Sequence, residues 1–294
     1  MKIETIKYRK ERKMRLIIVR HGDPNYEIDS LTEKGWREAE FLSVRMEKQL
    51  QKEHTYIYTS PLGRAKDTAS LTLKKLGMTA TEFKWLREFE APAIDEDTGT
   101  YKVCWDLLPA RWTSEPAYYD KDQWMNTPFM KKAKADTESA WVYDGLDSLL
   151  KKHGYTRDNG YYRAEHANRD TIVLFCHFGV ECVMLGHLLG ISPVVLWHGT
   201  AAAPSSVTTL YTEERREEKV LQAFVCSPLE ICLIYMQQMS RHPLQHDFVK
   251  HMIIWKKDMT DRVLFLTGGS NLPLVFYYKK QLDIEKTTSY NYQW

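Results

Sequence analysis

The segment IIVRHGDPNYE, residues 17–27, places an arginine, a histidine and a glycine directly after an apolar run. Residues 16–19 are apolar and bounded by charge, a pattern typical of a central strand buried on both faces. Polar residues at the end of such a strand suit a turn, a metal site or a reaction centre. The rest of the chain distinguishes between these alternatives.

Strands and helices are predicted to alternate beyond this segment. Apolar runs predict further strands at residues 56–60, 81–86, 171–176, 205–212 and 218–225. Helical spacing of apolar residues predicts helices at residues 30–51, 60–77 and 179–190. This alternation is typical of a three-layer α/β/α sandwich with a mostly parallel central sheet.

The first two helices carry end signals. Thr32 is the expected N-cap of the first helix, whose expected buried face is Trp36, Ala39, Leu42 or Ser43, Met46 and Leu50. Ser60 is the expected N-cap of the second helix, with Pro61 in the first turn and Gly77 after the last turn.

Residues 91–140 interrupt the alternation. They hold several prolines and tryptophans, namely Pro92, Pro109, Pro116, Pro128, Trp105, Trp112 and Trp124. A long insertion in an α/β domain is commonly a lid or a specificity element, which is our expectation for this region. Aromatic packing within the core is the alternative.

The composition argues against several classes of protein. A formal net charge of +2 over 294 residues gives no support for nucleic-acid or membrane-surface binding. The five cysteines are odd in number and show no C-x-x-C spacing, which favours reduced thiols. The most apolar region, residues 172–197, carries His177, Glu181 and His187, so it fails as a transmembrane helix. With no signal peptide recognised, we expect a cytoplasmic protein.

Polar residues follow each of the predicted strands. Arg20 and His21 end the first strand, Arg64 lies in the helix after the second, Glu88 follows the third, and His177 ends the fourth. Ligands of parallel α/β sheets bind at the carboxyl ends of the strands, so we expect these residues to converge. Arginines, histidines and helix N-termini together suit an anion, and planar guanidinium groups suit a phosphoryl group best.

A zinc site is the main alternative at this point, since two histidines and a glutamate could bind the metal. Neighbouring arginines would repel a cation, and the sequence has no H-E-x-x-H motif or Asp-rich cluster. It also lacks the G-x-x-x-x-G-K-[ST] loop of nucleotide-binding proteins. We therefore expect no metal and no other cofactor.

Taken together, the motifs resemble those of the histidine phosphatase superfamily, in its phosphoglycerate-mutase-like group (branch 1). VRHG at residues 19–22 resembles the family signature, TSPLGRAKDTA at 59–69 its second motif, and FCHFGV at 175–180 its second histidine motif. LREF at residues 86–89 stands where the family keeps its acid. The resemblance covers residues 14–227, the expected extent of the domain.

The resemblance implies a role for each candidate residue. His21 would be the nucleophile, Arg20, Arg64 and His177 would bind and stabilise the phosphoryl group, and Glu88 would act as the acid, with Glu90 as the other candidate. The sequence departs from the family at residues 23–25 (Asp-Pro-Asn) and at Phe178, which precedes the glycine of the second histidine motif. We therefore expect Asn25, Phe178 and Glu90 to lie near the substrate.

The expected function is hydrolysis of a phosphorylated small molecule through a phosphohistidine intermediate. No match to the phosphoglycerate contacts of true mutases is found, which makes a phosphoglycerate-type mutase the second choice. An inactive phosphate-ester-binding protein is a further alternative, against which the intact candidate residues argue. The expected partner is the small-molecule phosphate ester alone, with no nucleic acid and no membrane.

Both ends of the chain differ from the predicted domain. Residues 1–13, MKIETIKYRKERK, predict a disordered basic extension with Met14 as an alternative start, unless they form a functional basic arm. Residues 228–294 lack a clear period, and where the family has a segment like FGD-[IM]-SHLYAA this chain has PLEICLIYMQQMSRHPLQHDF. When this segment is back-translated with degenerate codons and then read from the third base of each codon, the shifted frame permits the sequence FGDMSHLYAADEP. This pattern predicts a one-base frame shift near residues 227–228 and a poorly ordered tail; a divergent extension is the alternative.

Overall fold

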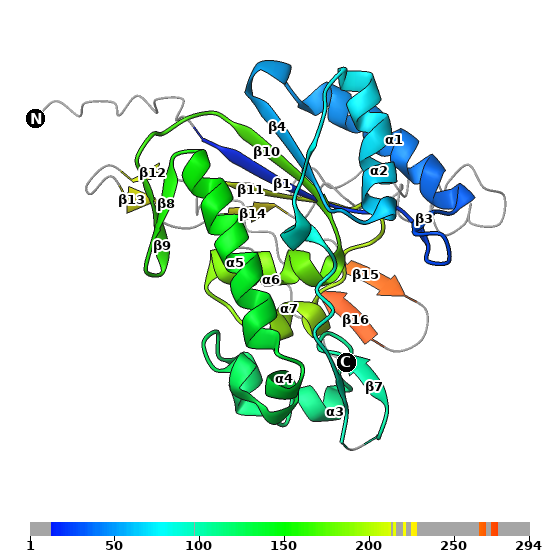
Figure 1. Ribbon diagram of the computed structural model, residues 1–294, viewed down its shortest axis with the longest axis vertical. Helices are drawn as coiled ribbons and strands as arrows, with labels where there is room; N and C mark the ends of the chain where they lie inside the picture. The colour runs from blue at the N-terminus through cyan, green and yellow to red at the C-terminus, as the bar shows by residue number, and fades with distance from the viewer. Residues whose placement is uncertain are drawn as a thin grey trace, which may run out of the picture. The chain divides into compact units, whose positions relative to one another are not determined.

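Six strands form the central sheet in the order β14-β11-β1-β10-β4-β5 (Figure 1). Their bounds are Arg15–Arg20 (β1), Thr55–Thr59 (β4), Thr81–Glu82 (β5), Thr171–Cys176 (β10), Val207–Tyr211 (β11) and Val225–Ser227 (β14). Strands β1, β10, β4 and β5 run parallel, whereas β11 is antiparallel to β1 and β14 is antiparallel to β11. The mostly parallel sheet predicted from the sequence is therefore confirmed.

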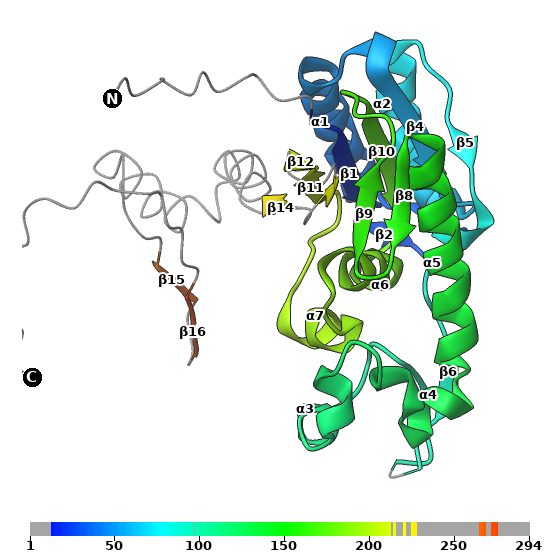
Figure 2. The ribbon, with the colours of Figure 1, turned by 90° about the vertical axis from the view of Figure 1, so that its left-hand side faces the viewer.

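Helices cover both faces of this sheet and complete the three-layer sandwich (Figures 1 and 2). Successive residues of a strand point to opposite faces, so β1 contributes to two separate cores. Ile17 and Val19 pack with α1 (Glu33–Gln49) and α2 (Gly63–Leu76). Leu16 and Ile18 pack on the other face with α5 (Ala135–Lys152) and α6 (Phe178–Leu189). Burial on both faces explains why residues 16–19 of this strand are all apolar.

The computed structural model describes residues 13–96, 98–212, 214–215, 220–221, 225–227, 265–268 and 272–275. The chain divides into two compact units, Met1–Ile231 and Cys232–Trp294. In the second unit, the described residues form an antiparallel pair of strands, β15 (Phe265–Gly268) and β16 (Leu272–Val275). The predictions for the basic extension and for the frame-shifted tail otherwise fall outside the described residues and stay predictions.

The remaining strands of the first unit form smaller sheets. An antiparallel sheet contains β12 (Glu214–Arg215), β13 (Val220–Leu221), β9 (Tyr161–Ala164) and β8 (Tyr155–Asp158), and β2 (Pro24–Asn25) pairs with β3 (Ser30–Leu31). The single strand predicted at residues 218–225 is therefore wrong, because residues 220–221 lie in the smaller sheet and residue 225 begins β14. An apolar run fits a buried strand in either sheet, so the pattern alone could not separate them.

The two helices with end signals differ from the prediction in detail. Thr32 caps α1 by accepting a hydrogen bond from Gly35 N at 3.1 Å, as predicted. Trp36, expected in the core, is 38% exposed. Helix α2 begins at Gly63 rather than after Ser60, whereas Gly77 ends it in the left-handed conformation (φ 58°) as predicted.

The third predicted strand, residues 81–86, is only partly a strand. After β5 the chain forms a 3₁₀ turn, η2 (Lys84–Leu86). Trp85 and Leu86 are adjacent and both buried, which a helical turn allows but a half-buried strand with a period of two does not. Glu88 follows this turn by two residues.

The insertion at residues 91–140 is built from short elements. They are the hairpin of β6 (Pro92–Ile94) and β7 (Tyr101–Val103), then α3 (Pro109–Trp112), η3 (Pro116–Tyr119), η4 (Trp124–Asn126) and α4 (Pro128–Lys132). Aromatic packing within the core is confirmed for Trp124, and the lid or specificity element stays a prediction. Trp124 is fully buried in the core, with its ring centroid 5.5 Å from that of Trp197, whereas Trp105 lines a pocket.

Two short helices complete the described part of the first unit, η1 (Lys52–His54) and α7 (Pro193–Gly199). Within the residues that the structure describes, none of the helices combines the length and the apolar character needed to cross a bilayer.

Candidate active site

Three neighbouring strands of the central sheet end at one edge, and a polar residue follows each. The parallel register of β1, β10 and β4 aligns their carboxyl ends, so His21, His177 and Ser60 are brought together. The backbone N–H of His21 donates to Cys176 O at 3.0 Å, and that of Ser60 donates to Phe175 O at 2.9 Å. The two imidazole rings lie 5.1 Å apart between centroids. The structure thus places both predicted histidines at the predicted edge.

His21 is buried, and its ring is fixed by a hydrogen bond between Nδ1 and Gly22 O at 2.7 Å. A carbonyl oxygen can only accept, so Nδ1 carries the proton and Nε2 keeps its lone pair. Burial lowers the pKa of His21 to about 4; the Gly22 hydrogen bond opposes this, and the charges of Arg64 and Arg20 lower it further. The imidazole is therefore neutral at pH 7, with Nε2 available as a nucleophile.

Ser60 does not cap its helix because its hydroxyl has another partner. The Oγ atom lies 2.7 Å from His177 Nε2 and accepts a hydrogen bond from Leu62 N at 3.2 Å. His177 is fully buried, and burial, followed by the charge of Arg64, holds its pKa well below the usual range. Its Nδ1 is buried with no hydrogen-bond partner among the described residues. His177 is thus a neutral imidazole of fixed orientation.

The two arginines are each held by one nitrogen. Arg64 Nη1 donates to Asp29 Oδ1 at 2.6 Å, and Asp29 Oδ2 accepts from Gly63 N at 2.6 Å, which ties the arginine to the start of α2. Arg20 Nη1 donates to Ala202 O. In the described part of the chain, the Nε of each arginine is buried without a partner. Both guanidinium groups therefore retain donors for an anion.

Glu88 is anchored through one oxygen. Its Oε1 accepts hydrogen bonds from Phe89 N at 2.8 Å and from Val180 N at 3.2 Å. Burial raises the pKa of Glu88, while these two N–H groups and the nearby arginines oppose that shift without cancelling it. Because N–H groups bind the oxygen that lacks a proton, the protonated carboxyl carries its hydrogen on Oε2. Glycine at position 179 makes this approach possible, since a Cβ there would lie 2.6 Å from Oε1.

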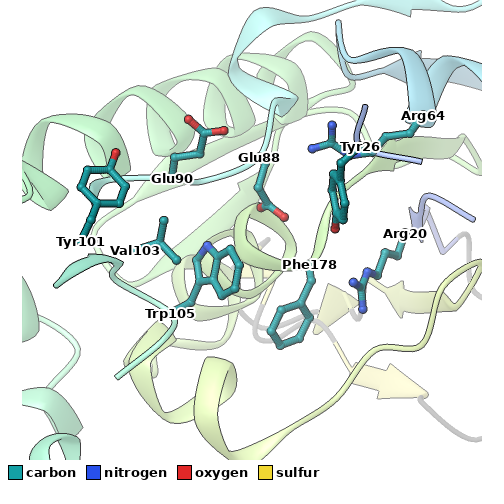
Figure 3. A pocket seen from close by; sticks show the side chains of 9 residues that line it. All are labelled: Arg20, Tyr26, Arg64, Glu88, Glu90, Tyr101, Val103, Trp105 and Phe178. Atoms are coloured by element: carbon teal, nitrogen blue, oxygen red, sulfur yellow. The ribbon is translucent and has the colours of Figure 1, made fainter. Parts of the chain in front are cut away.

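A pocket of about 460 Å³ opens beside these groups (Figure 3). It is lined by Arg20, Tyr26, Arg64, Glu88, Glu90, Tyr101, Val103, Trp105 and Phe178. Figure 3 shows the arginines with Tyr26 at one end, and Glu90, Tyr101 and Val103 at the other end. Glu88 lies between the two ends. The pocket therefore has a basic end and an acidic, aromatic end.

Of the three residues expected near the substrate, two line the pocket and one does not. Glu90 and Phe178 line the pocket. Asn25 is not among the lining residues, and its Oδ1 accepts a hydrogen bond from Glu27 N at 3.1 Å within the turn. Tyr26, the next residue along the chain, lines the pocket in its place.

Other residues of the site were missed by the sequence analysis. Ser60 directly follows a parallel strand, as the two histidines do, so that position was a usable signal. Asp29 lies in a turn and reaches Arg64 from 35 residues away. Tyr101 lies on β7 and Trp105 follows that strand, both within the insertion that was expected to form a lid or specificity element. No local pattern marks such contacts between distant segments.

A buried carboxyl outside the pocket lining belongs to Glu181. Glu181 of α6 accepts a hydrogen bond at 2.6 Å from Thr208 Oγ1, and its Oε2 has no partner among the described residues. Burial raises its pKa to about 7; the Thr208 hydrogen bond and the charge of Arg20 act in the opposite direction.

Metal ligation finds little support in this geometry. Over the described ranges of the chain, no group of three or more His, Cys, Asp or Glu side chains is placed to hold a metal ion. The chemistry that the arrangement can support is instead that of a neutral imidazole, two guanidinium donors and a protonated carboxyl around one anion.

Comparison with known proteins gives one family match. Residues 16–127 match the histidine phosphatase superfamily (branch 1), a range that includes His21, Arg64 and Glu88 but not His177. No match was found among curated protein sequences.

Solved structures similar to this chain include a mycobacterial glucosyl-3-phosphoglycerate phosphatase (16% identity, 74% of this chain and 98% of that chain, TM-score 0.48). A phosphoserine phosphatase mutant from Entamoeba histolytica, in complex with phosphoserine, is 19% identical over 72% of this chain and 96% of that chain (TM-score 0.45). Mycobacterial hydrolase 2 is 20% identical over 74% and 90% (TM-score 0.48). At these identities and TM-scores, no functional assignment follows from the similarities.

Proposed function

Because this chain belongs to the histidine phosphatase superfamily (branch 1), as its residues 16–127 show, we propose that it hydrolyses a small-molecule phosphate monoester through a phosphohistidine intermediate. The observation that carries the proposal is the state of His21. It is a neutral, buried imidazole whose Nδ1–H is bonded to Gly22 O, which leaves Nε2 free beside two arginines.

In the first step His21 Nε2 attacks phosphorus, and the N–P bond forms as the bond from phosphorus to the ester oxygen breaks. The electron pair of the broken bond goes to the ester oxygen, which takes the proton from Glu88 Oε2. The alcohol leaves, and Glu88 becomes a carboxylate. Raising the pKa of Glu88 keeps this acid protonated closer to neutral pH than an ordinary glutamic acid.

In the second step a water oxygen attacks the phosphorus of phosphohistidine. Glu88 takes a proton from this water, the N–P bond breaks, and its electron pair returns to Nε2. The products are the alcohol and inorganic phosphate, and both His21 and Glu88 return to their starting states.

Arg20, Arg64 and His177 would bind the phosphoryl oxygens throughout. Removal of one such donor typically costs about 3–4 kcal/mol in the barrier, and loss of a positioned general acid costs roughly 10²–10⁴-fold in rate. Two steps with a covalent intermediate each have a lower barrier than direct attack by water.

The test is release of phosphate from a generic aryl phosphate, in the presence and absence of a chelator. We expect turnover that the chelator does not change and that His21→Ala abolishes while the fold is retained. Full activity of His21→Ala would refute the role of His21. Turnover that requires a bisphosphoglycerate primer would indicate a mutase, and binding of vanadate without turnover would indicate an inactive binding protein.

A further inference from the structure

The lining of the pocket changes character from one end to the other. Arg20 and Arg64 form one end, and Glu90 lies at the opposite end with Tyr101 and Val103 beside it (Figure 3). Trp105 lies between this end and Glu88. The phosphoryl group of a bound ester belongs at the arginine end. Its alcohol group must then point past Glu88, which protonates it, toward Glu90.

The aromatic rings at the arginine end already have cationic partners. The guanidinium of Arg20 lies over the Phe178 ring at 5.6 Å from the centroid, and that of Arg64 lies over the Tyr26 ring at 5.3 Å. These contacts orient the arginines, and they occupy the ring faces that a substrate cation would otherwise use.

The aromatic rings at the far end differ in this respect. Among the residues that the structure describes, no cation–π pair involves Trp105 or Tyr101. Trp105 is fixed at its edge, because its Nε1 donates to Phe89 O at 2.7 Å. Tyr101 is 70% exposed and forms the outer rim. Both rings are therefore available to a ligand cation.

Glu90 supplies a negative charge to the pocket that these rings line. It is exposed, and it makes no hydrogen bond or ion pair with any other described residue. An anionic alcohol group at this end would face two carboxyl groups, Glu88 and Glu90. An apolar alcohol group would displace water from the Glu90 carboxylate with no partner in return. A neutral hydroxyl group could donate to the carboxylate only, whereas a cation interacts favourably with both the carboxylate and the ring faces.

We infer that the substrate is a phosphate monoester of an amino alcohol, whose ammonium or quaternary ammonium group binds between Glu90, Trp105 and Tyr101. The inference rests on the proposed function, because the phosphoryl group must occupy the arginine end for the alcohol to reach Glu90. The inference predicts that, among substrates of equal chain length, the enzyme selects by the charge on the leaving group.

Matched substrate series test this inference. The kcat/KM values are measured for ω-aminoalkyl phosphates with two to four methylenes, against the ω-hydroxyalkyl and ω-carboxyalkyl phosphates of the same length. We expect the best amine to exceed its hydroxyl counterpart by about tenfold, and the carboxylate to fall below both. The result is a ratio, which a general change in the stability or amount of enzyme does not alter.

Two variants connect this ratio to the residues. Glu90→Gln removes the charge at constant shape, and Tyr101→Leu removes a ring from an exposed position; each should bring the amine-to-hydroxyl ratio toward one. The matched control is Glu53→Gln, which removes an exposed carboxylate that does not line the pocket and should leave the ratio unchanged.

The outcomes separate this inference from the proposed function. Hydrolysis of aryl phosphate with equal kcat/KM across the charge series would overturn the inference and leave the function intact. An amine preference that persists in Glu90→Gln and Tyr101→Leu would also overturn it. Absence of aryl phosphate hydrolysis in the wild type would overturn the proposed function and the inference together.

Discussion

Substitution of Gly179 by alanine tests how the general acid is positioned. Gly179 lies in the first turn of α6, and a Cβ at this position would be 2.6 Å from Glu88 Oε1 and 2.9 Å from Trp105 Nε1. Ordinary contact begins near 3.4 Å, so the Glu88 carboxyl must move by roughly 0.8 Å. That movement weakens the hydrogen bond from Val180 N, now 3.2 Å.

A displacement of about 1 Å at a reacting group can cost on the order of 10²-fold in rate. The loss should depend on the leaving group, because Glu88 acts by protonating it. Alkyl phosphates, whose alcohols are poor leaving groups, should lose roughly 100-fold in kcat/KM. A nitrophenyl phosphate, whose phenolate leaves without help, should lose much less.

The assay is phosphate release from both substrates by Gly179→Ala, with thermal unfolding as the check on the fold. Gly199→Ala is the matched control, since a Cβ there meets nothing within 4 Å. Equal losses on both substrates, or full activity on alkyl phosphates, would refute the assignment of Glu88 as the acid.

Three further predictions follow from the protonation states and contacts. Because the pKa of His21 is lowered to about 4, kcat should fall only below about pH 4 on the acid side; it is measured at saturating substrate, so that ionisation of the free phosphate ester at about pH 6 does not contribute. The kcat should also fall at higher pH as Glu88, whose pKa is raised, loses its proton. An acid limb of kcat near pH 6.5 would contradict the neutral, buried His21. Ser60→Ala should lower the free energy of unfolding by about 1–3 kcal/mol in urea titrations, because Leu62 N and His177 Nε2 lose their partner; an unchanged midpoint would contradict the contact. A carboxyl whose pKa is higher in the folded state than in the unfolded state contributes less to stability as the pH rises from 4.5 toward 7. Between pH 5 and pH 8 the free energy of unfolding of the wild type should therefore fall by about 2–3 kcal/mol relative to that of Glu181→Gln. Stability curves of the two proteins that stay parallel over this pH range would contradict the buried carboxyl.

Much of the fold and part of the site could be predicted because they depend on local patterns. The apolar run before Arg20 marks a strand buried on both faces, and parallel strands present their carboxyl ends at one edge. That rule alone brings His21 and His177 together, although 156 residues separate them.

The rest depends on contacts that no local pattern encodes. Ser60 has the residue type and position of an N-cap, but a histidine 117 residues away binds its hydroxyl and the helix begins later. Glu88 is held by a backbone N–H of α6, and Trp105 reaches the pocket from the turn after β7. The exposure of Trp36 also follows from tertiary packing, since Gly35 and Glu38 occupy the buried positions of that turn.

The central claim is that Nε2 of His21 becomes covalently phosphorylated. The most direct measurement is intact-protein and peptide mass spectrometry after a rapid alkaline quench during turnover, since phosphohistidine survives base and is lost in acid. The account predicts one phosphoryl group on the peptide that contains His21, and none in His21→Asn. A wild-type enzyme that releases phosphate with no phosphoryl adduct in rapid-quench samples, or an adduct that remains in His21→Asn, would contradict it.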